Sequence, residues 1–218
     1  MNLYSQVKYV QSGEFMRPEI IEPTHQKGRE SQERIVRATL ALIKEVPFDQ
    51  LTIAQIMEEA GMAVGTFYRR FKTKESVLPF VFKAYDELFE RWASSFEDEN
   101  PRTPGEAIEL IVRKTAQLFL KNAGLIRTVH LYNRLHPRMS NAPPNRGELS
   151  RLMGAVLAKD FHHPSRDDLL RGRMAVLTMV SAMTEQILYC DLPPTTTTNL
   201  RNKDVHVFLV KMMGALAA

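Results

Sequence analysis

The sequence predicts an all-α fold, and three observations support this prediction. Apolar residues recur at spacings of three and four, the period of a helix that buries one face. Proline and glycine residues interrupt this pattern at intervals that leave helix-sized segments between them. No segment shows the alternation of a convincing strand. With 218 residues, of which 44% are hydrophobic, the chain can bury a sizeable core.

The charge balance argues against a chain that binds polyanions over its whole surface. The 29 Lys and Arg residues nearly match the 25 Asp and Glu residues, which leaves a formal net charge of +4. The single cysteine, Cys190, cannot close an intrachain disulfide, and the N-terminus lacks the apolar run of a secretory signal. No apolar run is long enough to cross a membrane. We therefore expect a cytoplasmic protein that does not engage a membrane.

The chain is expected to begin with an extension and one helix. Residues 1–28 mix proline, glycine and charges without a sustained period, which predicts a flexible N-terminal extension. From Ser31 apolar residues return at helical spacing, and Pro47 forbids continuation of that helix.

Two short helices separated by a tight turn are expected next. Thr52 is followed at the third position by Gln55, the arrangement of a capping box that starts a helix. This helix is expected to run to Ala60. Gly61 then stands where a left-handed residue would stop it, and a further short helix is expected from Val64.

A long amphipathic helix is expected from Thr73 to Phe96, because large apolar residues recur there at spacings of three and four. Proline and glycine bound the rest, which gives a total of about nine helices. The further helical segments are 104–122, 124–136, 146–161, 166–190 and 198–217.

The segment from Gly65 to Lys74 carries the chemistry expected of a nucleic-acid interface. It holds hydroxyl groups, a phenol and four cations, with no acidic residue before Glu75. Such groups donate to phosphates and neutralise them, while Phe67 and Phe71, four residues apart, should face the core. An ordinary helical hairpin would show the same helix-turn-helix outline. The basic face favours a second helix that lies in the major groove.

In this region the chain resembles the TetR family of repressors. The resemblance rests on three runs in register, which together cover about a fifth of the chain. They are Thr52-Ile53-Ala54-Gln55-Ile56-Met57-Glu58-Glu59-Ala60-Gly61, Gly65-Thr66-Phe67-Tyr68-Arg69-Arg70-Phe71 and Lys74-Glu75-Ser76-Val77-Leu78.

The resemblance implies a three-helix DNA-binding domain over 29–75 and a helical effector-binding and dimerisation domain over 76–218. It also implies phosphate contacts by Thr52, Thr66, Tyr68 and Lys74, and Ala63 and Val64 depart from the usual capping and base-reading residues. The full set of expected DNA-binding residues is Thr52, Ala63, Val64, Gly65, Thr66, Tyr68, Arg69, Arg70, Lys72 and Lys74.

The C-terminal domain is expected to pair with a second copy and to hold an unknown small molecule. Two apolar stripes predict the dimer interface, although such stripes can also fill the core of a monomer. The interface residues are Met174, Leu177, Thr178, Ser181, Ala182, Glu185, Leu188, Val205, Phe208, Leu209 and Met212. Residues expected to line a ligand pocket, or simply a hydrophobic core, are Tyr85, Phe89, Trp92, Phe96, Phe119, His130, Asn133 and Gln186.

No enzyme, cofactor or metal site is predicted. The adjacent histidines His162 and His163 point to different sides of a helix and lack the spacing of metal ligands. We therefore expect a homodimer that binds a palindromic DNA operator and is released by an effector. The alternative is an effector-independent regulator or adaptor whose C-terminal domain binds another protein.

Overall fold

The computed structural model describes residues 20–217, with gaps at 22, 97, 136–164 and 189–201. Within these ranges every extended regular element is a helix, and the only β-type pairing is an isolated bridge between Ile20 and Phe71. The predicted all-α fold class is confirmed. The helix expected over 146–161 lies outside the described residues, as does Cys190. Within the described segments, none of the helices combines the length and apolarity that a membrane crossing requires.

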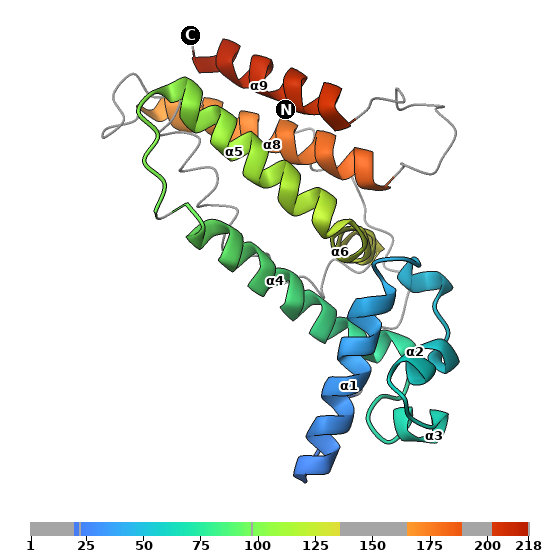
Figure 1. Ribbon diagram of the computed structural model, residues 1–218. Coiled ribbons are helices and arrows are strands. Elements are labelled where there is room, and N and C mark those ends of the chain that lie inside the picture. The colour runs from blue at the N-terminus through green and yellow to red at the C-terminus, as the bar shows by residue number, and fades with distance from the viewer. Residues whose placement is uncertain (1–19, 22, 97, 136–164, 189–201, 218) are drawn as a thin grey trace, which may run out of the picture.

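The N-terminal part consists of helices that pack around one small core (Figure 1). Buried apolar residues from each element, among them Ile35, Ile56 and Phe67, meet in this core. The elements are α1 (Gln26–Leu42), a 3-10 turn (Phe48–Gln50), α2 (Ile53–Glu59), α3 (Val64–Phe67), a second 3-10 turn (Lys74–Val77) and α4 (Leu78–Ser94).

The local signals that bound α2 act as predicted. The Thr52 hydroxyl accepts a hydrogen bond from the Gln55 amide at 3.2 Å, and the Thr52 amide donates to the Gln55 side chain at 2.9 Å. At the other end Gly61 has φ of 62°, where a side chain would be strained. The predicted capping box and glycine stop are therefore confirmed.

One predicted boundary, that between the N-terminal extension and the first helix, is wrong. The first helix begins at Gln26, inside the segment expected to be a flexible extension. Just before it, the amide of Ile21 donates to the carbonyl of Arg70 at 2.9 Å and ties the chain to the region after α3. The short helix expected from Val64 begins there and ends at Phe67.

The C-terminal part stacks its long helices in layers (Figure 1). α5 (Pro104–Lys121) packs against both α8 (Arg166–Leu188) and α9 (Asn202–Ala217), and α4 packs against α6 (Ala123–Leu135). The helices expected over 104–122, 124–136, 166–190 and 198–217 are thus present with small shifts at their ends.

α6 connects the two parts of the protein. Its residue Gly124 lies so close to the end of α1 that only glycine fits there. A side chain on Gly124, in the first turn of α6, would overlap the backbone carbonyl of Ile43 at the end of α1. Nearby, the rings of Phe48 and Tyr132 meet edge to face with centroids 5.4 Å apart. The N-terminal helices are therefore held directly against the helical C-terminal part.

We expect Gly124→Ala to destabilise the protein by about 1–3 kcal/mol, the usual cost of forcing extra atoms into a packed site. The overlapped atoms are backbone, so no side chain can rotate away. The measurement is urea denaturation followed by circular dichroism. Gly105→Ala is the matched control, because the nearest atom to its methyl group would lie 3.9 Å away. Equal stability of the two variants would contradict the close approach.

Candidate DNA interface and ligand-binding core

α3 has one buried face and one exposed face. Phe67 and the following Phe71 are both fully buried, with ring centroids 5.3 Å apart, as the sequence predicts. On the other side Val64 is 43% exposed and Tyr68 is 53% exposed, although both are large and partly apolar. No atom lies within 4 Å of the position that a side chain on Gly65 would take. The exposed face of α3 is thus open to close approach by a partner.

The N-terminus of α3 lacks a side-chain cap. Ala63 occupies the cap position with extended backbone, and no side-chain hydrogen bond is made there. The free amides of a helix start carry partial positive charge and accept anions readily. Thr66 sits one turn further on, and its hydroxyl accepts a hydrogen bond from Arg69 at 2.9 Å.

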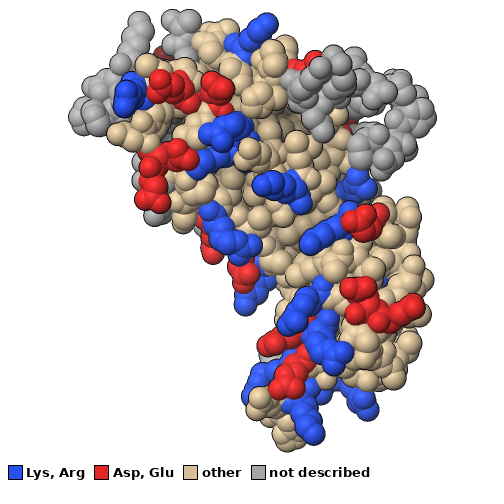
Figure 2. Space-filling view, viewed as in Figure 1, with Lys and Arg blue, Asp and Glu red and all other residues tan. Residues whose placement is uncertain are grey.

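The predicted cations do not all lie in the same environment. Arg69 and Lys72 are exposed near the end of α3. The guanidinium of Arg70 packs instead against Gly28, and its Nε is buried without a hydrogen-bond partner among the described residues. Figure 2 shows that basic and acidic side chains alternate over the visible face of this part of the molecule. Arg69 and Lys72 are therefore better placed for DNA than Arg70.

Lys74 makes contacts that sequence reasoning missed. Its ammonium nitrogen lies 2.9 Å from each of three backbone carbonyl oxygens, those of Phe48, Asp49 and Leu51. It also lies 5.0 Å from the centre of the Phe48 ring. Arg34 acts in a comparable way from α1, donating to the carbonyl of Ala60 at 2.6 Å. The α2 segment is thus held near both of its ends by cations from outside it.

The aromatic residues predicted to line a pocket form one connected stack. Along α4 the ring centroids are 4.6 Å apart for Tyr85 and Phe89, 6.1 Å for Phe89 and Trp92, and 4.9 Å for Trp92 and Phe96. Phe119 of α5 and His130 of α6 meet this stack from the side. We call these rings the aromatic ladder. Neighbouring rings of the ladder contact one another directly.

Gln186 lines a pocket that it shares with one other predicted pocket residue. It lies with Phe119 in a pocket between α5, α8 and α9, together with Val205, His206 and Leu209. This pocket has a volume of about 30 Å³. Such a space holds a water molecule or two, whereas drug-sized ligands need about 300 Å³ or more. Among the described residues, a bound effector would therefore need the helices to move apart.

Several polar atoms are buried in the C-terminal part without a hydrogen-bond partner in the described segments. They are Nε1 of Trp92, Oδ1 of Asn133 and Oγ1 of Thr184. Trp92 and Asn133 were predicted as pocket residues, while Thr184 was missed because a lone threonine in an apolar helix gives no distinct signal. An unpaired buried polar group costs about 1–3 kcal/mol, so a ligand that pairs with it gains binding energy.

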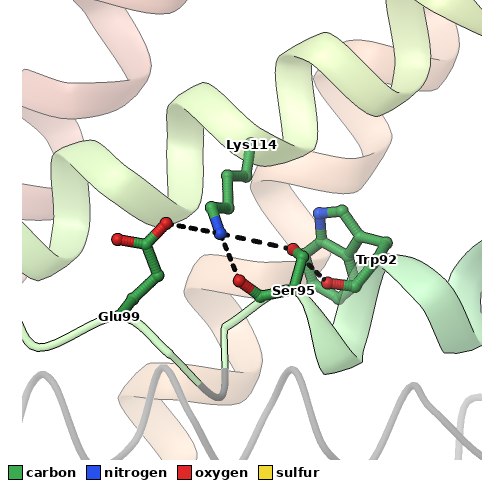
Figure 3. A network of polar contacts seen from close by, with 4 residues as sticks. All are labelled: Trp92, Ser95, Glu99 and Lys114. Atoms are coloured by element: carbon green, nitrogen blue, oxygen red, sulfur yellow. Dashed lines mark hydrogen bonds and ion pairs between the residues drawn. The ribbon is translucent and has the colours of Figure 1, made fainter.

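Lys114 lies beside Phe96 at one end of the aromatic ladder and is the centre of the polar network in Figure 3. Its ammonium group forms an ion pair with Glu99 at 2.7 Å, donates to the carbonyl of Ser95 and lies 4.8 Å from the centre of the Phe96 ring. The hydrogen bond from Lys114 is the main reason that the pKa of Glu99 is lowered. This network ties the end of α4 to α5. Sequence reasoning did not predict it.

The predicted dimer residues differ in how exposed their side chains are. On the outer faces of α8 and α9, Met174 is 54% exposed, Leu177 is 60% exposed and Phe208 is 62% exposed. Leu209 is fully buried, so its assignment to an interface is wrong and it belongs to the monomer core. Thr178 and Ser181 are exposed, Ala182, Glu185, Val205 and Met212 are partly buried, and the side chain of Leu188 is not described.

The described residues contain no group of three or more His, Cys, Asp or Glu side chains that could hold a metal ion. His162 and His163 lie outside the described residues.

A short capped helix, a glycine turn and an exposed second helix, attached to a larger helical domain, define the class of helix-turn-helix regulators. Comparison with known proteins agrees. Residues 35–79 match the family model described as bacterial regulatory proteins, tetR family. Residues 35–79 of the chain are therefore similar to this family of bacterial regulatory proteins, as the sequence runs between Thr52 and Leu78 indicated.

Curated relatives match over part of their length. The HTH-type transcriptional repressor KstR of Rhodococcus jostii is 34% identical over 84 residues, 38% of each chain. The fatty acid metabolism regulator protein of Bacillus subtilis is 28% identical over 109 residues, 50% of this chain and 53% of that protein. The chain thus spans about half or less of these relatives.

Solved structures extend the similarity in fold to the C-terminal part. The transcriptional regulator FadR from Bacillus subtilis, in complex with stearoyl-CoA, has a TM-score of 0.53 at 18% identity, covering 85% of this chain and 97% of that chain. A tetR-family regulator from Streptomyces coelicolor has a TM-score of 0.60 at 18% identity, covering 86% and 80%. The fold of this chain is that of TetR-family regulators.

Proposed function

We propose that this protein is a homodimeric, sequence-specific DNA-binding repressor whose affinity for its operator falls when a small molecule binds. The observation that carries the proposal is the exposed face of α3, where Val64, Thr66 and Tyr68 surround an open helix start. Large apolar side chains left exposed on a four-residue helix indicate a surface that meets a partner. The match of residues 35–79 to a DNA-binding family indicates which partner.

In this proposal α3 enters the major groove while α2 crosses the backbone. Thr66, Tyr68, Arg69 and Lys72 would contact phosphates, and Val64 can read a thymine methyl group or the shape of the groove. The amides at the start of α2, next to Thr52, and those after Ala63 add partial positive charge toward the strand. Most of this binding energy would be electrostatic and would weaken with salt.

A dimer would place two copies of α3 on neighbouring turns of DNA, about 34 Å apart. The exposed apolar side chains of Met174, Leu177 and Phe208 support pairing through α8 and α9. Leu170, 58% exposed, and Val207, 51% exposed, extend the same apolar character along these helices. Burial of these residues against a second copy would remove a large apolar area from water.

We propose the aromatic ladder and the helices around it as the effector site. The side chains of the ladder are aromatic, and its two titratable groups, Tyr85 and His130, already contact each other at 3.4 Å. The enclosed part of an effector would therefore be uncharged, because a buried charge needs a partner. The stearoyl-CoA complex of the similar Bacillus subtilis regulator supports a long apolar ligand for this fold.

Release from DNA would follow from a shift between two states. α4 carries most of the aromatic ladder and begins at Leu78, directly after the 3-10 turn that contains Lys74. Opening the helices around the ladder would move α4 and α6, and this movement would change the spacing between the two copies of α3.

The small pocket volume, about 30 Å³, supports a second candidate, an effector-independent regulator whose C-terminal part binds another protein.

The effector can be tested with the only tryptophan of the chain, Trp92, as a fluorescent reporter in the site. We expect stearoyl-CoA to change Trp92 emission and to bind more weakly when the protein is held on DNA selected as its operator. If the ligand lowers operator affinity a hundredfold, linkage requires a loss of about 2.7 kcal/mol of its own affinity on the DNA-bound form. Equal ligand affinity with and without operator would contradict effector release, and failure to bind would favour the second candidate.

The dimer can be tested with Leu177→Arg on α8. A charge at this 60% exposed position should not disturb the monomer, but it cannot be buried unpaired against a second copy. We expect the variant to sediment as a folded monomer and to bind operator at least about tenfold more weakly, because linked contacts are lost. Leu131→Arg on α6, at a position 38% exposed, is the control and should remain dimeric. A dimeric Leu177→Arg would rule out pairing through this face.

A further inference from the structure

We infer that Lys74 is a positioning residue that fixes the start of α2 against the first turn of the α4 segment, and that it is not a phosphate ligand. The inference rests on the proposed DNA-binding function, but its geometry stands independently of it. The resemblance to the family implies a phosphate contact for Lys74, and the structure assigns its ammonium group to three carbonyls within the protein.

The hydrogen-bonding capacity of Lys74 is filled by these contacts. A lysine ammonium has three hydrogens to donate, and the carbonyls of Phe48, Asp49 and Leu51 each lie 2.9 Å from its nitrogen. The Phe48 ring, 5.0 Å from the nitrogen, covers the same cation. A phosphate could recruit Lys74 only by breaking one of these bonds. We call this arrangement the lysine clamp.

The lysine clamp acts on the segment that leads into α2. Carbonyls at the end of a short helix carry partial negative charge and have no partner within the helix, so a cation there is stabilising. Leu51 directly precedes Thr52, the capping residue of α2. Holding the Leu51 carbonyl therefore holds the first turn of α2. At the far end Arg34 donates to Ala60, so α2 has little freedom to tilt.

The regulatory part of the protein contacts the same segment from a second side. Lys74 lies in the 3-10 turn that continues into α4. Tyr132 of α6 packs edge to face on Phe48, with ring centroids 5.4 Å apart. Burial, with Glu75 and Asp49 nearby, raises the pKa of Tyr132 to about 12. Movement of α4 or α6 would thus directly shift the segment from Phe48 to Leu51, which precedes α2.

The test replaces Lys74 with a residue that keeps the positive charge but cannot donate to the three carbonyls from one nitrogen. Three carbonyls converge on one nitrogen, and the planar guanidinium of arginine spreads its hydrogens over separate nitrogens, so Lys74→Arg cannot rebuild the clamp. A phosphate contact, in contrast, is served by either cation. The variants are Lys74→Arg and Lys74→Met, with Lys72→Arg and Lys72→Met as matched controls at an exposed, proposed phosphate ligand. Operator affinity is measured from 50 to 200 mM salt on protein that circular dichroism shows to be fully folded.

We expect Lys74→Arg and Lys74→Met each to bind operator about tenfold more weakly, since bonds from a charged donor are lost. The slope of log affinity against log salt should stay as in the unsubstituted protein. Lys72→Met should flatten this slope by about 0.9, and Lys72→Arg should leave it unchanged. A role in stability alone would lower the melting temperature without changing the affinity of the folded protein, and that result would overturn the positioning role.

A flattened slope for Lys74→Met together with full activity of Lys74→Arg would show a phosphate contact and overturn the inference. If Lys74→Met does not fold, Lys74→Arg still decides between the two. If the unsubstituted protein binds no DNA, the proposed function fails. The lysine clamp is then judged by melting temperature alone, which Lys74→Arg should lower and Lys72→Arg should not.

Discussion

The burial of Phe67 and Phe71 beneath α3 is the contact on which the DNA-binding surface depends. A helix of four residues cannot persist in water by itself, because nucleation costs more than its few hydrogen bonds return. Both rings are fully buried. Their packing fixes the orientation of α3 and so determines that Val64, Thr66 and Tyr68 face outward. The capping box of α2 and the left-handed Gly61 place the two helices relative to each other, but the core holds them there.

The long helix α4 belongs to both halves of the molecule. Its first residues pack in the N-terminal core, while Tyr85, Phe89 and Trp92 form part of the aromatic ladder. α6 makes a second connection through the close approach of Gly124 to Ile43. A packed core shifts between discrete arrangements rather than deforming gradually. A ligand that separates the helices around Trp92 would therefore act on α3 through two rigid elements.

Sequence reasoning succeeded where the physical cause is local. The capping box needs only Thr52 and Gln55, the turn needs only Gly61, and the two phenylalanines follow from spacing four. It failed where distant segments meet. The contacts of Lys74 come from residues 23 to 26 positions earlier, and the backbone carbonyl of Arg70 accepts a hydrogen bond from Ile21, before α1. Periodicity placed Leu209 on an apolar stripe but could not show which side of α9 faces α5.

The central claim is that two copies of α3 read neighbouring turns of one DNA duplex. The most direct measurement is selection of bound sequences from a random DNA pool by the purified protein, followed by sequencing. The account predicts enrichment of an inverted repeat whose half-sites are separated by one helical turn, about 10 base pairs, or a multiple of it. Enrichment of a single half-site without symmetry would contradict the paired arrangement, and no enrichment over the starting pool would contradict sequence-specific DNA binding.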